Sequence, residues 1–104
     1  MDKDEAVRIA KRYLNFLQKK NINIVGAYLF GSFAKGADQL DSDIDLAIIF
    51  NELQDEIDMQ IQLMKFRRKF DLRIEPHPFT KKDLDGTNPM LNEILKTGLS
   101  LLIT

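Results

Sequence analysis

The sequence predicts a single domain of the α/β (α+β) class, spanning residues 1–104, in which helices flank a small mixed β-sheet. A chain of 104 residues has the usual length of one domain. Its apolar fraction of 44% and charged fraction of 30% are typical of globular proteins and not of disordered chains. Helix and strand patterns follow one another in the order α-β-(α)-β-α-β-α-β, which implies a sheet covered by helices.

The first helix is expected from Lys3 to Lys20. Asp2, followed three residues later by Glu5, has the pattern of a capping box. Asn21 is expected to close the helix. Between these ends the apolar residues recur at helical spacing, at Ala6, Ile9, Ala10, Tyr13, Leu14 and Leu17.

Two buried strands are expected next, at Ile24–Phe30 and Ile44–Phe50. Both are continuous apolar or nearly apolar runs of strand length, the first interrupted only by Gly26. Gly31 should stop the first strand. Residues 32–35 are expected to form a short helical turn, and residues 37–42 a polar loop.

The segment Gln54–Lys69 fits two periods. Its apolar residues alternate with polar ones, as in a strand, but they also form two helical stripes, Ile57/Ile61/Met64 and Met59/Leu63/Phe66. Its Gln, Met, Leu, Lys, Glu and Arg content favours a helix. One stripe would cover the sheet; the other would be an interface with a second copy or a partner protein, or would be buried under the C-terminal segment.

The C-terminal third is expected to contain one more strand, a helical turn, a helix and a last short strand. The strand is expected at Phe70–Glu75, ended by Pro76 and Pro78, with His77 in a restrained strand exit. Thr80 with Asp83 suggests a capped helical turn. The remaining signals are Asn88 and Pro89 opening a helix to Thr97, Gly98 stopping it, and a strand at 99–103.

Charge and composition exclude several classes of protein. Fifteen basic residues against 16 acidic ones give a net charge of −1, so binding to nucleic acid through a basic surface is not expected. Cysteine is absent and there is one histidine, which excludes disulfides, thiolate metal sites and a multi-histidine site within one chain. No stretch approaches a membrane span and no signal peptide is seen, so the expected setting is the cytoplasm, without membrane association.

Two acidic residues, Asp43 and Asp45, lie at the start of the second strand. Strand periodicity puts both carboxylates on one face, roughly 6.5 Å apart along the backbone. Their mutual repulsion must be offset by a raised pKa, a basic partner or a bound divalent cation. Because the donors are oxygens, a cation here would be Mg²⁺ or Mn²⁺ rather than zinc.

Asp71 is expected to begin the third strand, as Asp43 and Asp45 begin the second. If the two strands are parallel neighbours, the segment Gln54–Lys69 has the right length for the helical crossover between them. Asp71 would then complete a cluster of three carboxylates, balanced by two divalent cations. The alternatives are that Asp71 pairs with Arg73 or a lysine. Glu75 shares its strand parity but is expected to be structural.

Gly31 and Ser32 would supply the opposite side of a phosphate site. Glycine permits close approach of a ligand, and the turn that follows presents backbone N–H groups to an anion. Lys35, one turn further on, would neutralise phosphate oxygens. Phosphates on one side and cations on the other suit the transfer of a phosphoryl or nucleotidyl group by two-metal catalysis.

The pattern Gly31-Ser32-x10-Asp43-x-Asp45, followed by Asp71, resembles the signature of the DNA polymerase β nucleotidyltransferase superfamily. The size of the chain resembles the minimal nucleotidyltransferases of prokaryotes, which are often paired with a HEPN-domain protein in toxin–antitoxin modules. Many relatives have Arg where Phe33 stands here, and Lys35 would substitute for it.

The resemblance implies a polymerase-β-like fold and a Mg²⁺-dependent enzyme with two metal ions, with Mn²⁺ as a substitute. Asp43 and Asp45 would bind both metals, Asp71 the catalytic metal, and Gly31 and Ser32 the phosphates of a nucleoside triphosphate. AMP from ATP would pass to a hydroxyl acceptor, a tyrosine of a HEPN-domain toxin, so that the chain acts as an antitoxin. The alternative is a non-catalytic module that neutralises its HEPN partner by contact alone.

The sequence leaves open the base of the nucleotide, the identity of the acceptor, and whether the chain is catalytic or only binds. It also leaves open the oligomeric state, which includes a homo-oligomer, and the roles of His77 and the basic run Lys65–Lys69. That run is either a solvated face or a contact for an acidic partner.

Overall fold

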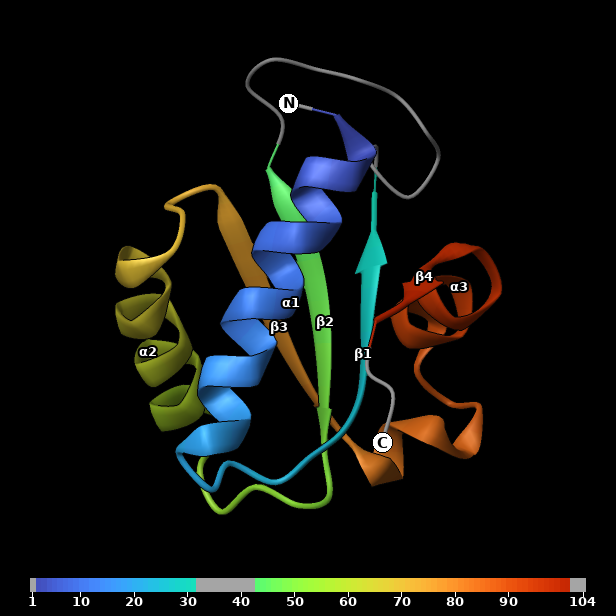
Figure 1. Cartoon of the computed structure of the whole chain (residues 1–104). Helices are drawn as coiled ribbons and strands as arrows, with labels where there is room; N and C mark the ends of the chain where they lie inside the picture. Colours follow the sequence, from blue (N-terminus) through green and yellow to red (C-terminus); the bar gives the residue numbers. More distant parts are fainter. Residues whose placement is uncertain (1, 32–42, 102–104) are drawn as a thin grey trace.

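In the computed structural model, residues 2–31 and 43–101 are described, and they form a four-stranded mixed sheet with helices on both faces (Figure 1). The strand order is β3-β2-β1-β4. The predicted fold class is confirmed; the expected turn at 32–35 and loop at 37–42 lie outside the described residues. The elements are α1 (Lys3–Lys19), β1 (Ile24–Phe30), β2 (Ile44–Phe50), α2 (Glu56–Phe66), η1 (Arg67–Lys69), β3 (Ile74–Thr80), η2 (Lys81–Asp85), α3 (Pro89–Thr97) and β4 (Leu99–Ser100).

Local signals define the ends of the helices as predicted. The Asp2 carboxylate accepts the Glu5 backbone N–H at 2.8 Å and caps α1. Asn21, at φ 60°, turns the chain out of this helix in the left-handed region that asparagine tolerates. The Asn88 side chain accepts the Leu91 N–H at 3.1 Å, Pro89 occupies the first turn of α3, and Gly98 follows its last residue.

Strand pairing makes α2 a crossover. β1 and β2 are antiparallel, whereas β2 and β3 are parallel neighbours. A parallel pair needs a long connection, and α2 with η1 supplies it, so the helical interpretation of Gln54–Lys69 is confirmed. β4 pairs antiparallel with β1 at the other edge.

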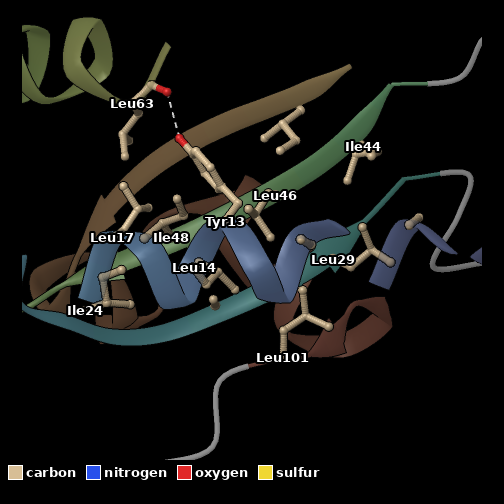
Figure 2. Close-up of a cluster of buried hydrophobic side chains, with 14 of the residues drawn as sticks. Tyr13, Leu14, Leu17, Ile24, Leu29, Ile44, Leu46, Ile48, Leu63 and Leu101 are labelled. Atoms are coloured by element: carbon tan, nitrogen blue, oxygen red, sulfur yellow. Dashed lines mark hydrogen bonds between the residues drawn. The ribbon is translucent and has the colours of Figure 1, made fainter. Parts of the chain in front are cut away.

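The main core lies between the sheet and the two helices α1 and α2. Figure 2 shows Tyr13, Leu14 and Leu17 of α1 against apolar side chains of β1 and β2. Leu63 joins this core from α2, and its carbonyl accepts a 2.7 Å hydrogen bond from the Tyr13 hydroxyl. Burial raises the pKa of that hydroxyl. The bond ties α2 to α1 and thereby holds the crossover over the sheet.

The third strand differs from the prediction: it begins at Ile74 and not at Phe70, and it runs to Thr80. Residues 70–73 form a turn because the Asp71 carboxylate accepts the backbone N–H of Arg73 at 2.9 Å, and the Asp71 carbonyl accepts that of Ile74 at 3.2 Å. Phe70 meanwhile packs edge-on against the Tyr13 and Phe16 rings. The strand therefore cannot start until Ile74.

Pro76 and Pro78 lie inside β3, so the prediction that they end it was wrong, as was the placing of His77 at a strand exit. β3 is an edge strand, and alternate residues turn their backbone groups outward, away from β2. The outward carbonyls of Ile74 and Pro76 accept side-chain donors from Arg67 and Gln60. The prolines occupy outward positions, where no ladder N–H is needed, and they prevent another strand from pairing there.

The opposite face of the sheet carries a smaller core under α3. Leu91 and Ile94 of α3 pack against Ala47, Ile49 and Phe79 from the strands. Within residues 2–31 and 43–101, none of the helices has the length and apolar character needed to cross a membrane. On the same face, at the end where β2 and β3 begin, lie the partly exposed side chains of Asp45 and Glu75.

Candidate active site at the Gly31 end of the sheet

A row of three paired residues, Phe30, Asp45 and Glu75, crosses the sheet at this end. Phe30 pairs with Asp45, and Asp45 pairs in parallel register with Glu75. Their neighbours Ile44 and Ile74 are fully buried in the main core. Because side chains alternate along a strand, the two carboxylates lie side by side on the face away from α1. The side chains remain 32% and 39% exposed, so both are open to a ligand.

Gly31 is in close contact with the Asp45 carboxylate. It has φ 78°, a conformation that side-chain-bearing residues rarely adopt. A Cβ placed on it would lie 2.5 Å from Asp45 Oδ2, closer than the atoms can approach. Glycine is therefore required at this position for two reasons: its backbone conformation and the carboxylate packed against it.

His77 completes this side of the site. Its Nε2 lies 3.6 Å from Asp45 Oδ1, and its ring meets the Phe30 ring edge-on at 5.2 Å between centroids. Nε2 is buried and has no hydrogen-bond partner within the described part of the chain. His77 of β3 therefore lies directly beside the Asp45 carboxylate and borders the site on this side.

Asp43 directly precedes β2 and is exposed. It lies two residues before Asp45, and because side chains alternate along a strand, the two residues share one face of the sheet. Both residues lie at the end of the sheet next to Gly31, as the sequence predicted. Ser32 and Lys35, the predicted phosphate contacts, lie outside the described residues.

Asp71 is placed differently from the prediction, because it precedes β3 and its carboxylate is engaged by Arg73. It accepts Nε at 2.9 Å and Nη2 at 2.6 Å, in addition to the Arg73 backbone N–H. These bonds hold the pKa of the Asp71 carboxyl below its ordinary value. The alternative that Asp71 pairs with Arg73 is confirmed, and its role as a metal ligand stays a prediction.

The Asp71–Arg73 pair is expected to make stability depend on pH. The pKa of Asp71 is lower in the folded chain, so the pair stabilises the fold above about pH 4 and its contribution is lost as the pH falls through the folded-state pKa. Asp71→Asn should therefore lower the free energy of unfolding by about 1 kcal/mol at neutral pH, a figure reduced by the partial exposure of Arg73. Urea unfolding of both proteins from about pH 7 to about pH 3 measures this. A difference that does not shrink on acidification would contradict the assignment.

Glu75 was expected to be structural, and it is the residue in register with Asp45. Its Oε1 lies 3.5 Å from Nη1 of Arg67. The same nitrogen donates to the Leu72 and Ile74 carbonyls, both at 2.9 Å. Arg67 belongs to the basic run whose role the sequence left open, and its side chain is partly buried against the sheet edge and Glu75. The sequence signal was available: proline at alternate positions 76 and 78 is typical of an edge strand, which would have extended the strand beyond Glu75.

The donor set of this end suits a hard divalent cation. Asp45 and Glu75 offer carboxylate oxygens, and Asp43 offers another next to them. Across residues 2–31 and 43–101, no group of three acidic or histidine side chains is close enough to hold a metal by itself. Magnesium is commonly held by one or two carboxylates together with substrate phosphates, so these residues fit such an ion.

A pocket of about 290 Å³ lies beside Gly31, between the end of β1 and α3. Phe30 and Ile94 give it an apolar wall, and Glu93 and Thr97 a polar one. A second pocket, of about 190 Å³, lies at the far ends of β2 and β3, next to Asn51 and Thr80. Of these two, the first is lined by Gly31, which packs against Asp45.

Comparison with protein families identifies the class of protein that this fold and site define. The family model described as "Polymerase beta, Nucleotidyltransferase" matches residues 12–102. The chain therefore belongs to the polymerase beta nucleotidyltransferase family, and the resemblance drawn from its motif is confirmed. A search of curated proteins found no match.

Solved structures share the fold. A candidate nucleotidyltransferase from Sulfolobus solfataricus is similar with a TM-score of 0.65 and 20% identity, over 80% of this chain and 74% of that one. A toxin–antitoxin structure with AMP-PNP has a TM-score of 0.65 and 23% identity, over 90% and 73%. A variant of the toxin–antitoxin complex MntA–HpeT has a TM-score of 0.63 and 21% identity, over 89% and 71%. At these identities the likeness establishes the polymerase-β-like fold.

Proposed function

We propose that this protein transfers a nucleoside monophosphate, AMP from ATP, to a hydroxyl group on a protein partner in the cytoplasm. The observation that carries the proposal is the packing of Asp45 against Gly31, beside Glu75, at one end of the sheet. A nucleotidyltransferase needs a carboxylate pair next to a glycine turn. The carboxylates bind the cations that bridge the phosphates, and the backbone N–H groups of the turn bind the phosphate oxygens of the same triphosphate.

Asp43 and Asp45 are proposed as ligands of Mg²⁺, which Mn²⁺ could replace. When bound, two such ions would neutralise the triphosphate and polarise its α-phosphate. For the third carboxylate we propose Glu75, because it is in register with Asp45. We prefer it to Asp71, whose carboxylate is bound by Arg73. The Glu75 carboxylate accepts the proton of the acceptor hydroxyl.

The triphosphate is proposed to lie along Gly31, Ser32 and Lys35. Gly31 leaves the space that a Cβ would take, and Lys35 balances phosphate charge. The acceptor oxygen then forms a bond with the α-phosphorus, and the bond from that phosphorus to the oxygen bridging to the β-phosphate breaks. Pyrophosphate leaves with this oxygen.

The partner is proposed to be a HEPN-domain toxin, whose tyrosine hydroxyl accepts AMP. The support is the structural likeness to nucleotidyltransferases of toxin–antitoxin complexes, one of them solved with the ATP analogue AMP-PNP. In this proposal the chain is the antitoxin, and addition of AMP silences the toxin.

A label-transfer experiment tests this function. The protein is incubated with Mg²⁺, ATP labelled at the α-phosphate, and the product of the neighbouring gene. Label is expected on the partner, in the presence of Mg²⁺ and not of EDTA. Stable complex formation without label would instead favour a module that acts by contact alone.

The choice of third carboxylate makes a separate prediction. Glu75→Gln is expected to lower the rate of transfer by about 10²-fold or more, because it removes the proton acceptor while keeping the shape of the side chain. Asp71→Asn is expected to retain most of the activity at neutral pH, since it lies outside the row of paired carboxylates. Single-turnover rates of the two variants, each confirmed as folded by circular dichroism, decide the matter. A large loss in Asp71→Asn with little in Glu75→Gln would reverse the assignment.

A further inference from the structure

Helix α2 presents an apolar stripe to solvent. Ile57 is 76% exposed and Ile61 is 49% exposed, with half-buried Met64 one turn further on. The opposite stripe, Met59, Leu63 and Phe66, packs into the main core. Figure 1 shows α2 at one side of the molecule, with no other described element outside it. Exposed apolar side chains that line up on one helix face are typical of a protein interface.

Charges on this helix are separated along its length. Asp55, Glu56 and Asp58 lie at its N-terminal end. Lys65 is in its last turn, followed by Arg68 and Lys69 in η1. All six of these side chains are exposed. The separation agrees with the helix dipole, but the dipole gives no reason for the isoleucines between the two ends to be exposed.

We propose that α2 pairs with α2 of a second copy of this chain, antiparallel and around a two-fold axis close to Ile61. In that arrangement the acidic end of each helix meets the basic end of the other, and Ile57, Ile61 and Met64 form the seam. Asp58 lies three residues before Ile61 and Lys65 four residues after it. Across the axis, Asp58 of one helix therefore lies within one residue of the position opposite Lys65 of the other.

The second copy is the partner because the surface is complementary to itself. A two-fold interface requires one patch that matches its own rotated image, and a helix with opposite charges at its ends meets that requirement. Pairing through the adjacent sheet edge is prevented by Pro76 and Pro78 in β3. This inference does not depend on the proposed catalytic function, because α2 and the carboxylates lie on different faces of the sheet.

Sedimentation equilibrium of the purified chain tests the pairing. The wild-type chain is expected to be dimeric, and Ile61→Asp is expected to raise the dissociation constant by at least about 10-fold. Leu84→Asp is the matched control, because Leu84 is a similarly exposed apolar residue, 44% exposed, away from α2. A wild-type chain that remains monomeric up to roughly 200 μM, or an equal effect of both variants, would overturn the proposal.

Charge reversal distinguishes the antiparallel arrangement from any other. One double variant carries Glu56→Lys and Asp58→Lys, and the other carries Lys65→Glu and Arg68→Glu. Each alone is expected to be monomeric because like charges then meet across the axis, while an equimolar mixture should form a heterodimer. Circular dichroism of each variant checks that α2 is retained. Two folded variants that do not associate when mixed would overturn the arrangement.

Discussion

Asp45→Asn is expected to lower the rate of nucleotidyl transfer by about 10³-fold or more. The substitution keeps the size of the side chain, so the contact with Gly31 and the place beside His77 are preserved. It removes one of the two negative charges of the neighbouring pair Asp45 and Glu75. The residues that remain would hold a divalent cation and its triphosphate much more weakly.

The free energy of unfolding of Asp45→Asn should rise slightly or stay unchanged, although its transfer rate falls. Asp45 and Glu75 are paired neighbours of like charge, and removing one charge relieves their repulsion. The comparison is single-turnover label transfer, run beside a thermal melt and beside Asp58→Asn, an acidic residue of α2 outside the site. Transfer at the wild-type rate by a folded Asp45→Asn would eliminate the proposed mechanism.

Gly31→Ala is expected to have the second-largest effect, on both stability and transfer. Its backbone at φ 78° strains any side-chain-bearing residue, by about 1–2 kcal/mol. In addition, the new Cβ would lie 2.5 Å from Asp45 Oδ2 and would force this carboxylate from its place. Since a misplacement of about 1 Å can lower a rate about 10²-fold, transfer should fall by that order.

Gly86→Ala separates these two causes. Gly86 also has a positive φ, 94°, but a Cβ there would meet no atom within 4 Å. Its alanine variant should show the backbone strain alone and keep full activity. Thermal melts and transfer rates of the two variants form the test. Equal loss of stability with unchanged transfer in Gly31→Ala would contradict the contact with Asp45.

The sequence predicted part of the candidate site, and the reason for each success or miss differs from residue to residue. Gly31, Asp43 and Asp45 were singled out because they stand next to strong strand signals, and the structure confirms their places at the ends of β1 and β2. Glu75 was expected to be structural because it lies further than Asp71 from the strand start that was expected at Phe70. Asp71 was taken for the strand start, although its side chain forms a turn with Arg73.

Arg67 and His77 could not have been found from spacing alone. Arg67 reaches the Leu72 and Ile74 carbonyls and Glu75 because η1 folds back over the start of β3. His77 lies beside Asp45 because the two strands are parallel in one particular register. Contacts of this kind depend on the pairing of segments that are distant in the chain, which local patterns do not encode.

By itself, the sequence determined the helices, the first two strands, the covered sheet and the glycine–aspartate end of the site. These features depend on hydrophobic periodicity, capping residues and breakers, which act over a few neighbouring residues. Only the tertiary structure decided where β3 begins, which acidic residue stands next to Asp45, and which stripe of α2 is left to solvent. The physical reason is that strand register and helix rotation are set by packing against the whole core, where burying Ile74 and Leu63 turns Glu75 toward Asp45 and Ile57 toward water.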